Sequence, residues 1–188
     1  MKVINFSSML GQKRKGVEYT GKFLKEYIKN EFYDVPCKNS SKNRIKYLAN
    51  NLSNLYNANI FFDKKINIGG DHSMAIATVA DSLNRVPQNK LKVVWFDAHA
   101  DINTYSSSIT KNFHGMPLSF LSKLEKKYEF PFIVNTLNLK NLIYVGIREL
   151  DSYEEKIINK YGINYIQSDE LNNKPEKNIE EIKKFINN

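Results

Sequence analysis

The chain contains three histidines, and each lies in a short motif rich in groups that bind metals or move protons. His72 lies in GGDHS (69–73), His99 in DAHAD (97–101) and His114 in NFHGMP (112–117). Confining so few histidines to three such motifs favours chemistry over chance. Imidazole and carboxylate side chains together suit Mn²⁺, Zn²⁺ or Fe²⁺, so the motifs indicate a candidate metal site.

The motif at 97–101 carries the strongest signal. It follows Val93–Phe96, an apolar run typical of a buried parallel strand. Asp97, His99 and Asp101 occupy alternate positions and would point the same way if the strand geometry continued. Burying three ionisable groups without partners costs several kcal/mol apiece, so they need a cation or mutual pairing. We interpret them as metal ligands in preference to a hydrogen-bonded surface turn.

The other two motifs are weaker when each is taken alone. GGDHS follows the expected strand Lys65–Ile68, and its glycines allow a sharp turn at the strand end where α/β sheets bind ligands. Ser73 is expected to cap the helix that follows. This motif is equally compatible with a simple turn, and a loop histidine such as His114 is usually only exposed. The occurrence of all three motifs together favours one shared site.

The segments between the motifs alternate between strand and helix patterns, which predicts a parallel sheet covered by helices on both faces. The expected strands are Val3–Phe6, Lys65–Ile68, Lys92–Asp97, Asn141–Val145 and Asn164–Ile166. The expected helices are Glu18–Ile28, Arg44–Tyr56, Met74–Leu83, Leu118–Leu124, Tyr153–Tyr161 and Ile179–Ile186. Long loops are expected at 103–113 and 129–140. The predicted fold is a three-layer, doubly wound, mostly parallel α/β sheet in one domain over residues 1–188.

The net charge of +8 raises the question of a nucleic-acid partner. The basic residues are scattered, the densest runs (13–15 and 123–127) are short, and no nucleic-acid-binding motif accompanies them. We therefore expect a solvated, lysine-rich surface and no nucleic-acid partner. No apolar run approaches the ~18 residues of a membrane span. The single Cys37 and the lack of a signal-peptide pattern at the start indicate a cytoplasmic protein.

Three aspartates, Asp71, Asp97 and Asp101, cluster at the candidate site of this basic chain. The site is therefore expected to be a local negative well that attracts metal ions and other cations. Without a metal, like-charge repulsion and burial predict a raised pKa for at least one of the close carboxylates.

In order and spacing the three motifs resemble those of the ureohydrolase family, and within it the arginases. Further similarity occurs at Gly11-Gln12, at Gly16-Val17-Glu18, at Ile143–Arg148 and at Tyr161-Gly162-Ile163. The resemblance covers nearly the whole chain and is weakest across 30–63. It implies an α/β fold, two Mn²⁺ ions and hydrolysis of L-arginine to L-ornithine and urea.

Residue by residue, the resemblance implies that His72 and Asp101 bind one Mn²⁺ ion. His99 would bind the other ion, and Asp97 would bridge the two. Water between the metals would become a hydroxide that attacks the guanidinium carbon, with Asp101 passing its proton to the leaving amine and His114 acting as a proton shuttle. The implied substrate contacts are Asn103, Thr110 and Asn112 for the α-carboxylate, Asp151 for the α-amino group, and Glu154 as a nearby supporting acid.

The chain departs from the arginase pattern in one respect. Arginases carry a further S-F-D-x-D-x-x-D-P motif, which supplies a second bridging aspartate and another metal ligand, and later a glutamate for the guanidinium group. None of these occurs in the 188 residues, so we expect the N-terminal part of such a domain, with a further strand after the last helix. Two alternatives stay open: a ureohydrolase acting on agmatine or formiminoglutamate, and an inactive relative that binds a partner or a metal. The expected partner is a small molecule, with no membrane and with self-association into a homo-oligomer.

Overall fold

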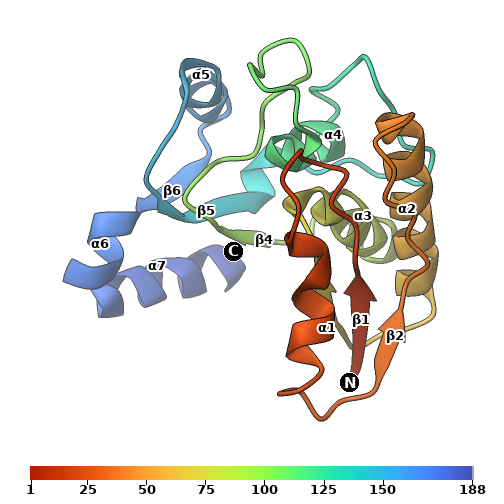
Figure 1. Ribbon diagram of the computed structural model, residues 1–188. Helices are drawn as coiled ribbons and strands as arrows, with labels where there is room; N and C mark the ends of the chain where they lie inside the picture. The colour runs from red at the N-terminus through yellow and green to blue at the C-terminus, as the bar shows by residue number, and fades with distance from the viewer. Residues whose placement is uncertain (188) are drawn as a thin grey trace.

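The computed structural model describes residues 1–187 and contains two parallel three-stranded sheets (Figure 1). The first has the order β2-β1-β3 and comprises β1 (Lys2–Phe6), β2 (Phe32–Asp34) and β3 (Lys65–Gly69). The second has the order β4-β5-β6 and comprises β4 (Val93–Phe96), β5 (Leu142–Ile147) and β6 (Asn164–Gln167). All five expected strands are present. The short edge strand β2 was not predicted, because three largely exposed residues leave no alternating pattern.

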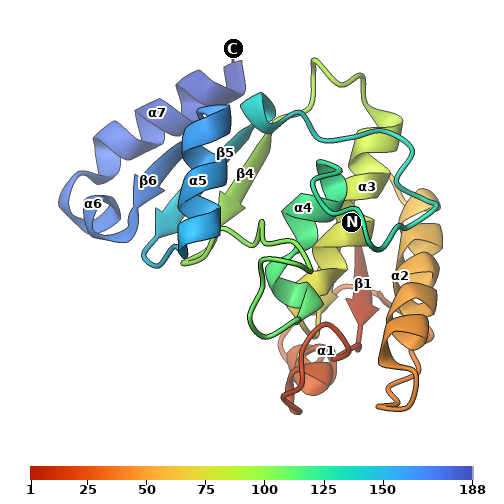
Figure 2. The ribbon, with the colours of Figure 1, turned by 90° about the horizontal axis from the view of Figure 1, so that it is seen from above.

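The helices cover these sheets on both sides, which confirms the expected α/β class. They are α1 (Thr20–Leu24), α2 (Arg44–Ile60), α3 (Ala75–Arg85), α4 (Pro117–Leu121), α5 (Ser152–Tyr161), α6 (Ser168–Asn173) and α7 (Pro175–Asn187). Helices α5 and α7 lie on opposite faces of the second sheet (Figures 1 and 2). Helices α2 and α3 pack against each other beside the first sheet. None of the helices in the described part of the chain combines the length and apolar character required to cross a membrane.

Three predicted elements end earlier than expected, and α6 was not predicted. Helix α1 stops at Leu24 and continues only as a turn, and β4 stops at Phe96, before the first aspartate of the 97–101 motif. Helix α4 ends at Leu121 because Lys123 has a φ of 56°. Such left-handed backbone cannot continue a right-handed helix.

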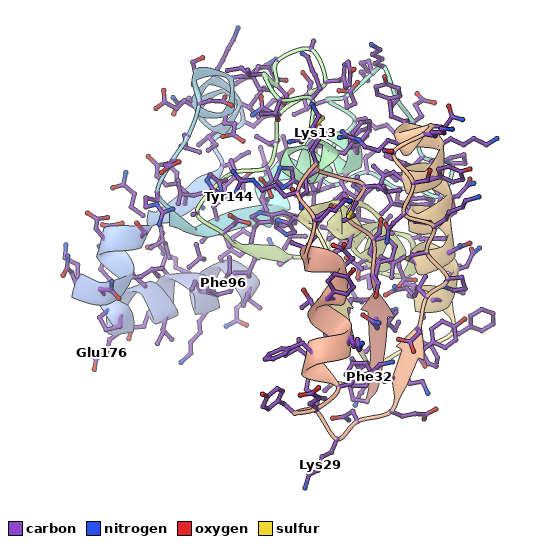
Figure 3. All side chains as sticks on the ribbon, viewed as in Figure 1. Lys13, Lys29, Phe32, Phe96, Tyr144 and Glu176 are labelled. Carbon is purple, nitrogen blue, oxygen red and sulfur yellow. The ribbon has the colours of Figure 1, made fainter. Side chains whose placement is uncertain are left out.

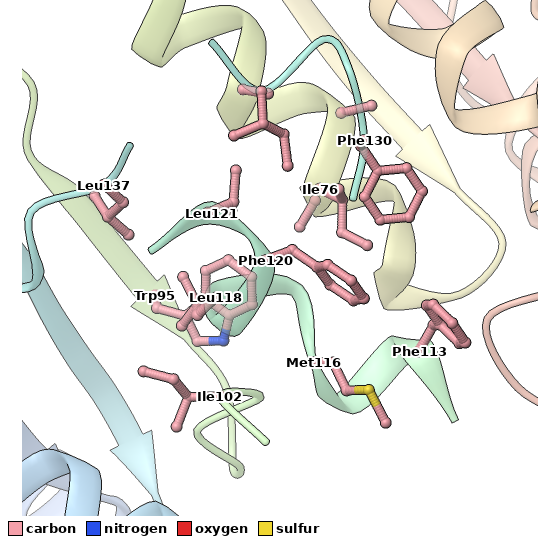
Figure 4. Packing of buried hydrophobic residues seen from close by; sticks show 14 of the residues in the cluster. Ile76, Trp95, Ile102, Phe113, Met116, Leu118, Phe120, Leu121, Phe130 and Leu137 are labelled. Carbon is pink, nitrogen blue, oxygen red and sulfur yellow. The ribbon is translucent and has the colours of Figure 1, made fainter. Parts of the chain in front are cut away.

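The hydrophobic core fixes the segment after β4 in place (Figure 4). Every residue of α4 is buried, and Trp95 of β4 belongs to the same core cluster. Phe113 stacks on Phe120 with ring centroids 5.5 Å apart, which ties the end of the 103–113 loop to α4. Aromatic contacts of this kind add about 0.5–1.5 kcal/mol each beyond area burial. The loop is therefore anchored at its carboxyl end by a rigid core.

The two sheets are not joined by strand pairing in residues 1–187. Strands β3 and β4 are each hydrogen-bonded to a neighbour on one side only, although α3 connects them in sequence. Apolar side chains are exposed on both edge strands: Ile66 is 43% exposed and Phe96, labelled in Figure 3, is 69% exposed. An edge strand presents unpaired N–H and C=O groups, so β3 and β4 each leave backbone groups and an apolar side chain accessible.

A buried ion cluster ties α3 to the start of β3 and generates the first prediction. Asp81 is 2% exposed, pairs with Lys65, and accepts a hydrogen bond from Arg85 Nε at 2.7 Å. Removing one partner leaves buried charge uncompensated, so Asp81→Ala should lower the free energy of unfolding by ~3–5 kcal/mol in urea denaturation. Asp63→Ala is the matched control, because Asp63 contacts the same Arg85 but is almost fully exposed. Its expected effect is below ~1 kcal/mol, and equal effects of the two variants would contradict the prediction.

Candidate functional site

The turn after β3 presents His72 through a close backbone approach. A Cβ atom at Gly70 would lie 1.9 Å from the carbonyl oxygen of Ser8, so only glycine fits there. Asp71 accepts hydrogen bonds from the amides of Gly11 at 2.8 Å and Ser73 at 3.0 Å. Asp71 therefore caps the turn, and the expected cap by Ser73 is wrong because the Ser73 hydroxyl is buried without a partner.

Three of the four predicted metal ligands converge at the carboxyl ends of β3 and β4. His72 Nδ1 lies 2.7 Å from Asp101 Oδ2 and 3.1 Å from Asp97 Oδ2. One ligand atom from each of these residues lies within 4.8 Å of the others. The His72 ring also stacks on Trp95 with centroids 4.5 Å apart, which limits its orientation. Two carboxylates and an imidazole at this spacing fit a divalent transition-metal ion.

The turn after β4 places the two aspartates beside His72, and strand alternation did not predict this backbone conformation. Ala98 O accepts hydrogen bonds from the amides of Arg148 and Glu149, which fixes the turn after β4 against the end of β5. Asp101 has a φ of 48°, a left-handed conformation that aspartate tolerates better than most residues. Its carbonyl oxygen accepts the amide of Leu118, so α4 holds this conformation in place.

His99 stays outside this three-residue group. Its side chain is 53% exposed, with Nδ1 3.4 Å from Asp97 Oδ1 and Nε2 3.7 Å from Glu149 Oε2. His99 can reach a second cation only on the solvent side of Asp97. Glu149 was not singled out from the sequence, because an acidic residue after a strand carries no distinguishing pattern.

The charges within the group are arranged by His72. Burial favours a neutral imidazole, but hydrogen bonds to Asp101 and Asp97 outweigh it and raise the pKa of His72 to about 9. Burial likewise opposes the ionised form of Asp97, yet the hydrogen bond from His72 holds the pKa of this carboxyl below its usual value. The pKa of Asp97 is thus lowered, whereas like-charge repulsion would raise it, because protonated His72 compensates the carboxylates.

A cleft of about 320 Å³ opens beside the three-residue group. All seven residues predicted for catalysis or substrate binding line it, and His99 lines it as well; the seven are Asp101, Asn103, Thr110, Asn112, His114, Asp151 and Glu154. No lysine or arginine is among its lining residues. The cleft therefore carries negative charge within a chain of net charge +8, and it favours a cationic ligand.

Hydrogen bonds connect several of these lining residues. Asn103 donates to Asp151 Oδ2 at 2.6 Å and accepts from Ser107 Oγ at 2.7 Å. Asp151 also caps α5 in a capping box with Glu154. Burial, with a smaller contribution from the charge of Asp151, raises the pKa of Glu154 to about 7. Tyr144 of β5 is fully buried with an unpartnered hydroxyl, and no sequence pattern assigned it a functional role beyond its place in the family-like stretch 143–148.

The parallel α/β fold thus carries an imidazole–carboxylate group that could hold a metal ion, next to an acidic cleft. Comparison with known proteins gives the family: the chain belongs to the arginase family, whose sequence model matches residues 2–188. It is 36% identical to arginase-1 of Xenopus laevis over 94% of this chain and 64% of that protein. It is 32% identical to the mitochondrial arginase-2 of Rattus norvegicus over 82% of this chain and 51% of that protein.

Solved structures agree with this assignment. The Entamoeba histolytica arginase in complex with L-ornithine superposes with a TM-score of 0.89 at 26% identity, covering 98% of this chain and 70% of that one. Formimidoylglutamase of Bacillus subtilis superposes with a TM-score of 0.73 at 16% identity, over 99% of this chain and 60% of that one, and so shares the fold. The chain spans less than two thirds of the length of the Xenopus and rat relatives.

The protonation of His72 gives a pH-dependent prediction for the metal-free chain. Because the pKa is raised from 6.5 to about 9, the stabilisation by protonated His72 is complete below pH 6.5 and is lost as the pH rises through about 9. In urea denaturation with a chelator, the stability advantage over His72→Gln should shrink across this window. His99→Gln serves as the exposed control and should show no such trend. A stability difference between the wild type and His72→Gln that stays constant between pH 6 and pH 10 would contradict the stabilisation by protonated His72.

Proposed function

We propose that this chain provides the metal-binding and substrate-binding part of an arginase-type hydrolase, which cleaves L-arginine to L-ornithine and urea. The observation that carries the proposal is the acidic cleft, in which seven predicted residues come together beside the group formed by His72, Asp97 and Asp101. Membership of the arginase family supports it. Because the chain spans only part of its relatives, the activity is proposed for the complete protein.

The described residues suggest a division of labour. When bound, divalent metal ions lower the pKa of water and thereby supply a nucleophile at neutral pH. Asp101 belongs to the three-residue group and also lines the cleft, so its carboxylate can accept a proton and pass it to the leaving nitrogen. His114 lines the same cleft and can exchange that proton with solvent.

Three residues of the loop 103–113 favour L-arginine over agmatine. Asn103, Thr110 and Asn112 line the cleft, and their side chains carry amide N–H and hydroxyl groups that can donate hydrogen bonds. Polar groups there suit a carboxylate, and agmatine lacks the α-carboxylate. Asp151 accepts a hydrogen bond from Asn103, and its carboxylate suits the α-amino group of the substrate.

The finer features belong to the same proposal. The metal is proposed to be Mn²⁺, with two ions in the complete site, because carboxylate-rich ligation with two histidines favours it over Zn²⁺. Residues 1–188 are proposed to form part of one domain. The complete protein is proposed to be cytoplasmic and to form a homo-oligomer; the single Cys37 supports a reducing compartment.

Counting ligands leads to the next prediction. Within this chain the second metal ion would have only His99 and Asp97, whereas catalytic sites normally use three or more protein ligands. Losing one preorganised group at a reaction centre commonly costs ~3–4 kcal/mol, or a few hundredfold in rate. The purified 188-residue chain should therefore bind at most one Mn²⁺ ion, weakly, and release no measurable urea from L-arginine. Calorimetric Mn²⁺ titration and a colorimetric urea assay measure both.

The matched experiment uses the same chain extended by a segment that supplies the S-F-D-x-D-x-x-D-P motif. That extended chain should release urea, and Asp97→Ala should abolish the release. Urea release by the 188-residue chain that is abolished by Asp97→Ala would show that its own ligands suffice. An extended chain that binds two ions but hydrolyses neither L-arginine, agmatine nor formiminoglutamate would overturn the proposed function in favour of a binding protein.

Specificity is tested in the same extended chain. Asn112→Ala removes an amide from the cleft wall, and charge-assisted hydrogen bonds are worth ~1.5–3 kcal/mol. The KM for L-arginine should rise at least about tenfold, while the kinetics with agmatine should be unchanged. Ser106→Ala, an exposed substitution in the same loop, is the control. Equal losses with both substrates would assign Asn112 to the structure of the loop.

A further inference from the structure

A second hollow, of about 630 Å³, lies next to the acidic cleft and shares Ile109 and Thr110 with it. Its lining is of the opposite charge. Lys13, Arg44 and Lys46 line it together with Lys111, and no aspartate or glutamate is among its lining residues. One segment of the loop 103–113 therefore separates an acidic cleft from a basic hollow.

The four cations of this basic hollow have no carboxylate partners in residues 1–187. Lys25, Lys65 and Arg85 are among the few basic residues in the described part of the chain that pair with carboxylates. In the hollow, Arg44 Nη2 donates to the carbonyl oxygen of Lys111 at 3.3 Å, and Lys111 Nζ donates to the carbonyl oxygen of Tyr105 at 2.6 Å. The first contact holds Arg44 against the backbone of Lys111, and neither contact neutralises a charge.

The start of α2 adds to the positive charge of the hollow. Arg44 and Lys46 lie in the first turn of this 17-residue helix, which has no acidic residue there and no side-chain cap. The amino end of a helix carries a partial positive charge, so basic residues at that position are normally disfavoured. The chain thus concentrates cations at a place where anions are stabilising, and a bound anion would relieve the mutual repulsion.

We propose that the basic hollow is a binding site for a phosphate or diphosphate group. The planar guanidinium of Arg44 can contact two phosphate oxygens at once, and the ammonium groups of Lys13 and Lys46 supply point charges. The volume of about 630 Å³ accommodates a diphosphate with its hydration shell. The inference concerns a site outside the proposed catalytic cleft and does not depend on catalysis.

Occupation of this site has a consequence for the adjoining loop. Lys111 has a φ of 57°, and its backbone amide donates a hydrogen bond to Ser108 Oγ at 3.1 Å. A bound anion would attract Lys111 Nζ and Arg44 from the loop side and the helix side together. The segment between the two cavities, 106–112, should then exchange its amide hydrogens more slowly.

The test is a titration of the 188-residue chain with sodium diphosphate, without divalent metal and at constant ionic strength held with sodium chloride. Calorimetry should show saturable binding with one site per chain. Hydrogen exchange should slow in residues 106–112. The double variant Arg44→Gln/Lys46→Gln should weaken binding at least about tenfold, because each charge-assisted contact to an oxyanion is substantial.

The matched control is Lys22→Gln/Lys29→Gln, which lowers the net charge equally. Both residues are exposed, and Figure 3 shows Lys29 at the end of the molecule away from Lys13. The control should change affinity by less than about twofold. Lys13→Gln, which disturbs no hydrogen bond of the fold, covers the case in which the double variant unfolds, and it should weaken binding on its own. Non-saturable binding, or equal weakening by the control, would reduce the effect to general charge and overturn the proposal.

Discussion

The contact between His72 and the two aspartates is the interaction on which the candidate site depends. It joins the carboxyl ends of β3 and β4, two strands that are not hydrogen-bonded to each other. Three ionisable groups at this depth require mutual compensation, and protonated His72 provides it in the metal-free chain. A divalent cation would replace that proton with a larger positive charge. The same arrangement thus bridges the two sheets and forms a group that could hold a metal ion.

Charge is distributed unevenly around this bridge. The chain is basic overall. The cleft beside the three-residue group is nevertheless lined by Asp101, Asp151 and Glu154, and no lysine or arginine lines it. The loop 103–113 keeps this negative region apart from the basic hollow at the start of α2. Phe113 and Phe120 anchor the carboxyl end of the loop in the core, so the polar residues before it lie between regions of opposite charge. A cationic ligand is favoured on one side and an anionic ligand on the other.

Strands β3 and β4 are both edge strands in residues 1–187, and the candidate site lies at their carboxyl ends. Stacking and hydrogen bonds with adjacent segments fix the geometry of His72 and Asp97. His99 points toward solvent, and Phe96 on the same edge is largely exposed. The arginases and arginase-fold structures that the chain resembles are longer, and the chain covers 64% of the Xenopus protein and 70% of the Entamoeba one. The candidate site residues lie in the segments that follow β3, β4 and β5.

The sequence by itself determined the order of strands and helices and the edge at which the motifs meet, because hydrophobic periodicity and the rules of parallel sheets are local or general. It also predicted a shared group of His72, Asp97, His99 and Asp101, of which the structure brings His72, Asp97 and Asp101 together. Tertiary structure decided that Asp71 is a cap, that Asp101 adopts a left-handed backbone, and that His99 faces solvent. Each of these outcomes depends on hydrogen bonds or packing between segments far apart in the chain, such as that of the Gly11 amide with Asp71, and residue spacing carries no information about such contacts.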